Sequence, residues 1–213
     1  MDLSQYFTSS DIAGIAPEII LTLTALVILT LEMARVTRPG IILLVAAFGL
    51  VLAGAAIVHG GTQGKILFGG MLYLSKFSMF FDFLYISVGL ATMIISQGYL
   101  EKMGSKSRGE YPALILFAII GMMLMTRAND LVMVFLGLEL LSLSLYVLVG
   151  FLRHNLYSNE SGLKYLLLGA FATGFFLFGA ALTYGATGTT NLSGIASAIA
   201  SGTILSDVYL YLG

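Results

Sequence analysis

Residues 131–151 read LVMVFLGLELLSLSLYVLVGF, and the only charged side chain among them belongs to Glu139. At about 1.5 Å per helical residue, this run spans about 30 Å, the thickness of the hydrocarbon core of a bilayer. An ionised side chain near the centre of such a helix costs about 2.5–3.5 kcal/mol. The stretch therefore predicts a transmembrane helix in which Glu139 faces a polar interior and handles an ion or a proton.

The whole chain has the composition of a membrane protein. Of its 213 residues, 58% are hydrophobic and 10% are charged, whereas soluble domains carry about 25% charged residues. A net charge of −1 gives no electrostatic basis for binding nucleic acid. The sequence has no cysteine, which excludes disulfides, thiolate zinc sites and cysteine-bound iron–sulfur clusters from this chain. The sequence shows neither a nucleotide-binding motif nor a pattern of metal ligands.

Six apolar runs predict an all-α fold, a polytopic bundle of transmembrane helices, because a backbone in lipid must form its hydrogen bonds internally. The runs are residues 17–35, 39–58, 77–100, 112–126, 131–151 and 162–184. All three prolines stand at the start of a run, where proline suits the first helical turn. A short helix over 192–200 and the beginning of a seventh span at 206–213 follow. We therefore expect the N-terminal part of a longer protein.

The distribution of lysine and arginine predicts that the N-terminus lies outside the cell membrane. Loops after the first, third and fifth runs carry six basic residues, and the opposite side carries three. The six are Arg35, Arg38, Lys102, Lys106, Arg108 and Arg153, and the three are Lys65, Lys76 and Arg127. Lys164 is left out of this comparison because it lies in or near the membrane.

Glu139 shares its predicted helix face with two other polar side chains. Ser142 and Tyr146 follow it at spacings of three and seven residues, so the three residues form a polar stripe on an otherwise apolar helix. The same helix carries small residues that favour the close approach of a neighbouring helix: Gly137, Ser144 and Gly150. The stripe is a candidate support for proton exchange at Glu139. The alternative is a protonated Glu139 that only hydrogen-bonds an adjacent helix.

Lys164, near the start of the sixth run, is the predicted partner of Glu139 in proton translocation. A carboxylate and an ammonium group in a wet membrane interior can form a switchable proton site. The sequence also offers Glu160, four residues before Lys164, in the order that favours an ion pair on a helix surface. In that arrangement the aliphatic stem of Lys164 would reach toward the membrane interface. Both alternatives stay open at the level of the sequence.

Other polar residues give weaker predictions. Asp82 lies inside the third run, deeper than a helix cap, and is a candidate for polar support of the proton path. Asn129 or Asp130 is expected to cap the fifth run. Glu18 and Glu32 flank the first run and are expected at the membrane interface. No catalytic residue for redox chemistry is predicted in this chain.

Two segments carry a specific family resemblance: LELLSLSLY, residues 138–146, and GLKYLLLGA, residues 162–170. They lie in a stretch, 111–192, that resembles the antiporter-like subunits of the membrane arm of respiratory complex I, and in particular the NADH-quinone oxidoreductase subunit N family. In that family a glutamate on the fifth helix and lysines on later helices form a proton-translocating chain. Glu139 and Lys164 match two of these positions.

The resemblance implies partners and a location. The partners would be the other membrane-arm and peripheral-arm subunits of complex I, within the lipid bilayer of the cell inner (plasma) membrane. FMN, iron–sulfur clusters and quinone would be bound by those partner subunits, with no cofactor in this chain. The protein would thus be a subunit of an NADH:quinone oxidoreductase, a translocase, without redox chemistry of its own.

The chain also departs from the family pattern. Family members are longer, with about fourteen helices built around two inverted repeats of five. The resemblance divides the present chain into an N-terminal three-helix segment, 1–110, and an incomplete first antiporter-like repeat, 111–213. The lysine-bearing seventh and eighth helices of the family have no counterpart in these residues. We therefore do not expect a complete proton path within them.

Two other functions compete with a proton-translocating subunit of an NADH–quinone oxidoreductase. A subunit of a multi-subunit cation/proton antiporter would share the fold and a similar glutamate. A non-pumping assembly subunit would belong to a different class. NADH-driven pumping distinguishes the first function from the antiporter, and tolerance of a neutral residue in place of Glu139 would identify an assembly subunit.

Overall fold

The computed structural model describes residues 9–34, 39–60, 64–102 and 109–213. In this part of the chain six long helices form a bundle, and each is long and apolar enough to cross a membrane. They are α2 (Ala16–Met33), α3 (Pro39–His59), α4 (Lys76–Lys102), α5 (Glu110–Arg127), α6 (Leu131–Val149) and α7 (Leu156–Thr187). The prediction of six spans in a helical membrane bundle is confirmed, and the protein is a multi-pass membrane protein.

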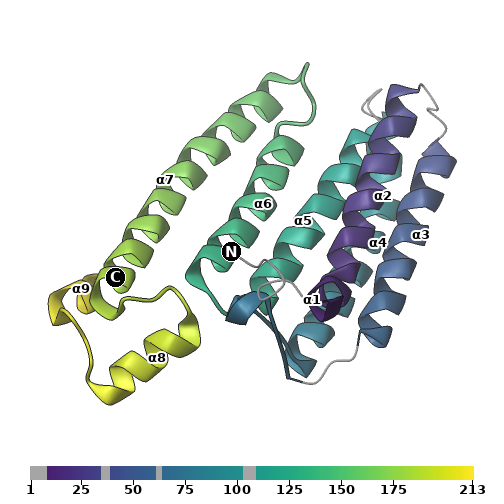
Figure 1. Cartoon of the computed structure of the whole chain (residues 1–213). Coiled ribbons are helices and arrows are strands. Elements are labelled where there is room, and N and C mark those ends of the chain that lie inside the picture. Colours follow the sequence, from purple (N-terminus) through teal and green to yellow (C-terminus); the bar gives the residue numbers. More distant parts are fainter. Residues whose placement is uncertain (1–8, 35–38, 61–63, 103–108) are drawn as a thin grey trace.

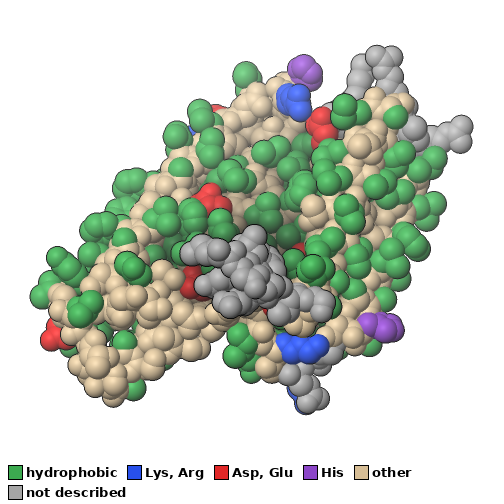
Figure 2. Space-filling model, viewed as in Figure 1, with side chains coloured by type: hydrophobic (Ala, Val, Ile, Leu, Met, Phe, Trp, Pro, Cys, Tyr) green, Lys and Arg blue, Asp and Glu red, His purple; other side chains and the backbone are tan. Residues whose placement is uncertain are grey.

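The helices α2 to α5 form one compact group, with α6 and then α7 beside it (Figure 1). α5 is the most buried of the six helices, because it packs against α2, α4 and α6, whereas α7 is the least buried. The core between them is apolar and includes Leu21, Ile28, Leu50, Leu116, Ile119 and Met123. In Figure 2, hydrophobic side chains are spread over the surfaces of the long helices and charged side chains are few, as expected where lipid is the solvent.

The longest helix, α7, begins before and ends after the predicted span 162–184. Asn155 caps its N-terminus, because the Asn155 side chain accepts hydrogen bonds from the backbone N–H groups of Tyr157 and Ser158. Its C-terminal cap is Gly188 in the left-handed conformation, with φ 73°. A helix of 32 residues is about 48 Å long. It therefore extends beyond the hydrocarbon core of a bilayer, which is about 30 Å thick.

Two pairs of glycines set the spacing of α5, α6 and α7. A Cβ atom added to Gly121 on α5 would lie 2.6 Å from Leu141 N and 2.7 Å from Gly137 O on α6. A Cβ atom added to Gly162 on α7 would lie 2.9 Å from the Cα of Gly150. Backbones can approach this closely only where side chains are absent. The close helix approach predicted at Gly137 and Gly150 is confirmed.

The shorter elements gather at one end of the bundle (Figure 1). The helices α1 (Ser9–Gly14), α8 (Leu192–Ser201) and α9 (Asp207–Leu212) include the short helix predicted over 192–200. An antiparallel hairpin of β1 (Lys65–Leu67) and β2 (Leu72–Leu74), with Lys65 opposite Leu74, was not predicted from the sequence. Three-residue strands are too short to show an alternating hydrophobic pattern. The 3₁₀ turn η2 (Phe68–Gly70) joins the two strands.

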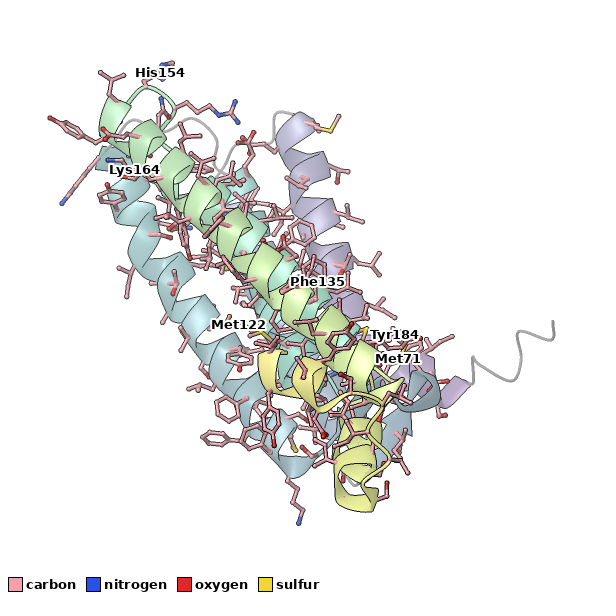
Figure 3. All side chains as sticks on the ribbon, turned by 90° about the vertical axis from the view of Figure 1, so that its left-hand side faces the viewer. Met71, Met122, Phe135, His154, Lys164 and Tyr184 are labelled. Carbon is pink, nitrogen blue, oxygen red and sulfur yellow. The ribbon has the colours of Figure 1, made fainter. Side chains whose placement is uncertain are left out.

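The hairpin is bound to the turn between α5 and α6 and to the start of α8. The amide groups of Asn129 and Asn191 both donate to Gly70 O, at 3.0 and 2.8 Å. Asn129 N donates to Met71 O at 2.8 Å. Asp130, rather than Asn129, caps α6, because its Oδ1 accepts from Val132 N. In Figure 3, Met71 and Tyr184 mark this end of the bundle, while His154 and Lys164 mark the other.

The α5–α6 crossing gives a first test. Gly121→Val should destabilise the chain by about 1–3 kcal/mol, because the added side chain must push two backbones apart. Gly174→Val on α7 is the control, since a Cβ there meets no atom within 4 Å in the described structure. Thermal unfolding of both variants in detergent, followed by circular dichroism, measures the effect. Equal melting temperatures would show that the crossing tolerates side chains.

Candidate functional site

Glu139 lies on the face of α6 that packs against α7. Two aromatic contacts define this face: Phe135 stacks on Phe176 with ring centroids 6.4 Å apart, and Tyr146 meets Tyr165 edge-on at 4.9 Å. Glu139 follows Phe135 by four residues and therefore lies between the two contacts. Its side chain is half-buried. In the described part of the chain it forms neither a hydrogen bond nor an ion pair.

The predicted polar stripe is present, but its members have separate surroundings. Tyr146 is buried and packs over Gly169 of α7, where an added Cβ atom would overlap the phenol ring. It follows Glu139 by seven residues, or about 10 Å along the helix axis, too far for a direct hydrogen bond. Ser142 is half-buried one turn from Glu139. Ser144, on another face, donates to Leu140 O at 2.7 Å.

Lys164 is paired with Glu160 in the structure. Lys164 Nζ lies 2.5 Å from Glu160 Oε1, and the two side chains are 69% and 58% exposed. The aromatic register between α6 and α7 places Lys164 opposite Val147, eight residues beyond Glu139. Eight helical residues correspond to about 12 Å along the axis. Of the two alternatives left open by the sequence, the structure forms the pair with Glu160.

A second charged cluster lies inside the bundle and joins three helices. Arg127, the last residue of α5, reaches Glu18 of α2 with Nη1 at 2.5 Å from Oε1. Its Nε and Nη2 atoms donate to Asp82 Oδ2 of α4, at 3.2 and 2.6 Å. Nη1 also donates to Gly14 O at 3.1 Å. We call Glu18, Asp82 and Arg127 the ion cluster; their side chains are 6%, 1% and 3% exposed.

The ion cluster corrects two predictions. Glu18 was expected at the membrane interface and Arg127 in an outer loop, but both are buried between helices. Glu32 does lie at the end of α2, half-buried, and accepts a hydrogen bond from Gly109 N at 3.0 Å. Asp82, a candidate for polar support of the proton path, binds Arg127 and contacts none of the stripe residues on α6 by hydrogen bond or ion pair.

A sequence signal for the ion cluster existed. Glu18 near the start of the first run, Asp82 near the start of the third and Arg127 at the end of the fourth all belong to the same membrane face in the predicted topology. Opposite charges at one depth of neighbouring spans are expected to pair, because an isolated charge in lipid is costly. Matching charges by depth, rather than considering each residue alone, would have found the cluster.

The described residues offer limited places for a bound group. No three histidine, aspartate or glutamate side chains come together among them in a way that could hold a metal ion. A groove of about 350 Å³ lies between the ends of α4 and α6 and the starts of α5 and α7. The described residues that line it are mostly aromatic and aliphatic and none of them is charged, with Tyr99, Tyr111 and Phe151 among them.

Comparisons with known proteins point to a single family. Residues 128–212 match the family described as "NADH:quinone oxidoreductase/Mrp antiporter, TM". The chain is 38% identical to NADH-quinone oxidoreductase subunit N of Trichlorobacter lovleyi over 214 residues, which cover 100% of this chain and 44% of that protein. It is 44% identical to subunit N 1 of Solibacter usitatus over 198 residues, 91% of this chain and 40% of the relative. The chain thus spans about two fifths of the length of these relatives.

Solved structures agree with this fold. A chain of respiratory complex I from Thermus thermophilus with bound aureothin superposes with a TM-score of 0.70 at 31% identity, over 92% of this chain and 42% of that chain. A chain of the archaeal membrane-bound sulfane sulfur reductase superposes with a TM-score of 0.75 at 20% identity, over 95% of this chain and 42% of that chain. The second likeness shows the fold alone. The family resemblance found in the sequence is confirmed by these comparisons.

Removal of Arg127 tests the energetic role of the ion cluster. Arg127→Ala should destabilise the chain by about 3–5 kcal/mol, because it leaves two buried carboxyl groups without their cation. Arg153→Ala is the matched control: Arg153 pairs with Glu110 at 3.2 Å but is 76% exposed, so its loss should cost about 1 kcal/mol or less. Denaturant titration of both variants in mixed micelles measures the difference. Equal midpoints would mean that the buried contacts contribute no more than the exposed pair.

Proposed function

Because this chain is related to NADH-quinone oxidoreductase subunit N, we propose that it belongs to the membrane arm of a proton-translocating NADH–quinone oxidoreductase. In this proposal Glu139 binds and releases a translocated proton. The observation that carries the proposal is a carboxyl group in the middle of a transmembrane helix that is bound by no other described side chain. A carboxylate so placed is costly and is free to exchange a proton. It also lies within the residues that match the antiporter family.

Lys164 influences Glu139 from a distance. At an axial spacing of about 12 Å, two unit charges interact by about 1.4 kcal/mol at an effective dielectric constant of 20. While Lys164 is paired with Glu160, much of its charge is compensated locally. Release from Glu160 would present a positive charge toward α6 and favour the ionised form of Glu139. The ion pair of Lys164 and Glu160 is therefore one of two states of a switch. Ser142 and Tyr146 provide polar groups on the face of α6 that carries Glu139.

Electron transfer occurs on other subunits in this proposal. FMN, iron–sulfur clusters and quinone are bound by the partner subunits of the membrane and peripheral arms, and their redox energy drives charge movement here. The complex lies in the cell inner (plasma) membrane with the N-terminus of this chain outside. Within the chain, residues 1–110 form an N-terminal three-helix segment and 111–213 contribute to the first antiporter-like repeat. Packing of α5 on α2 and α4 joins the two parts.

A cation/proton antiporter subunit is the alternative function. The description of the matching family includes the Mrp antiporter beside NADH:quinone oxidoreductase, and the same carboxyl group would serve either activity. An antiporter would move protons in response to a cation gradient, independently of NADH. A non-pumping assembly subunit would need no exchangeable carboxyl group at position 139.

The central test is Glu139→Gln in the full-length protein within its assembled complex. Glutamine keeps the shape and hydrogen-bonding capacity of glutamate but cannot ionise, so NADH-driven proton uptake by membrane vesicles should be lost or severely reduced. Glu139→Asp should retain part of the activity, because the carboxyl group is kept. Complex abundance is measured in parallel to exclude an assembly defect. Normal uptake by the glutamine variant would refute a proton-carrying role for Glu139.

Variants of the surface pair serve as controls in the same assay. Lys164→Arg should impair uptake less than Lys164→Ala, because arginine retains the charge. If the pair were only a surface contact, Lys164→Ala would cost about 0.3–0.5 kcal/mol and pumping would survive. Glu160→Gln distinguishes a role of Lys164 in pumping from a surface contact alone, because it releases Lys164 and keeps the positive charge of Lys164. Normal pumping by Lys164→Ala would remove Lys164 from the mechanism and leave Glu139 in it.

The proposed orientation has its own test. The chain has no cysteine, so single cysteines can be placed at exposed positions on opposite ends of the bundle. Thr203→Cys, after α8, should react with a membrane-impermeant reagent added from outside, whereas His154→Cys, between α6 and α7, should react only after permeabilisation. The reverse pattern would place the N-terminus inside.

A further inference from the structure

We propose that the ion cluster of Glu18, Asp82 and Arg127 is a second proton-binding site, which holds one proton together with one water molecule at the hairpin end of the bundle. The site is independent of the role assigned to Glu139, because it lies on α2, α4 and α5 rather than on α6. It also lies outside residues 128–212, which match the antiporter family.

The charges of the ion cluster do not balance. The ion cluster contains two carboxyl groups and one guanidinium group, so full ionisation would leave a net charge of −1. Among the described residues, Arg127 is the cation that forms ion pairs with the two carboxyl groups. All three side chains are almost completely excluded from solvent. An uncompensated charge in such a place is costly, and one bound proton neutralises it.

Arg127 does not contact every oxygen atom of the two carboxyl groups. The guanidinium directs Nε and Nη2 to one oxygen of Asp82, Oδ2, and Nη1 to Glu18 Oε1 and Gly14 O. Glu18 Oε2 and Asp82 Oδ1 are buried and accept no hydrogen bond from the described residues. A proton on one of these oxygens converts it from an unsatisfied acceptor into a donor. That donor in turn needs an acceptor nearby.

A small cavity provides the place for that acceptor. Asp82 and Arg127 line a cavity of about 20 Å³, together with Gly14, Ser78 and Gly60 among others. A volume of about 10–15 Å³ is enough to hold one water molecule where polar groups surround it. A water molecule there can hydrogen-bond the open oxygen of Asp82 and exchange its proton. The cavity also touches Leu74, the last residue of β2, and Ser75, and so lies at the hairpin end of the bundle.

Infrared spectroscopy of the 213-residue chain in lipid nanodiscs tests the proposal at neutral pH. A protonated carboxyl group has a carbonyl stretching band that an ionised carboxylate lacks. Glu18→Gln and Asp82→Asn each leave one carboxyl group for one guanidinium, so each variant should lose one such band relative to the unsubstituted chain. Glu110→Gln, which changes a partly exposed carboxylate that pairs with Arg153, should lose none. In D₂O the band should shift, because the cavity water exchanges the proton.

The outcomes are decisive in both directions. Loss of the band in both variants, with a shift in D₂O, supports the site. Retention of the band in either variant overturns the shared proton, and a band that does not respond to D₂O overturns the exchanging water. Should either variant fail to fold, the Glu139→Gln chain with ¹³C in the carboxyl groups of aspartate alone, or of glutamate alone, assigns the remaining band to a residue type without a contribution from Glu139. Absence of any protonated carboxyl band from that chain at neutral pH overturns the proposal.

Discussion

The hydrocarbon core of a bilayer offers no hydrogen-bond partners, and the structure follows from this constraint. Backbone groups form hydrogen bonds with one another within helices, and Arg127 of α5 pairs its charge with carboxyl groups inside the protein. Arg127 reaches Glu18, Asp82 and Gly14 O at the same time and so fixes α2, α4 and α5 to one another at one depth. Apolar packing is non-directional, whereas these directional contacts define a register between the helices.

The connection after α5 also fixes the position of α6, the helix that carries Glu139. Only residues 128–130 separate α5 from α6, and each of them is held in place. Ala128 pairs with Leu72 of the hairpin, Asn129 binds Gly70 and Met71, and Asp130 caps α6. Farther along, the glycine crossing brings the two backbones together. Glu139 therefore lies on a helix whose start and whose crossing with α5 are both fixed by specific contacts.

Hydropathy predicted the six helices because span length and apolar composition are local properties of the sequence. Cap residues extended α7 beyond its apolar run, since Asn155 and Gly188 act on the backbone rather than through hydrophobicity. The hairpin was missed because its strands are short and are stabilised by contacts with Asn129 and Asn191, far away in the sequence. Glu18 and Arg127 were misplaced for a related reason: three-dimensional packing decides whether a charge near the end of a span faces water or a partner.

Charges in this protein differ in how completely they are compensated. Arg127 binds Glu18, Asp82 and Gly14 O, whereas the two carboxyl groups around it retain oxygens without a hydrogen bond in the described structure. Glu139 has no hydrogen-bond or ion-pair partner in the described part of the chain. Lys164 pairs with Glu160, and this ion pair is weak because it is exposed. A fully satisfied charge resists any change of protonation, because every alternative state breaks a bond. Incompletely satisfied groups can gain or lose a proton at little structural cost, which is the property that proton translocation requires.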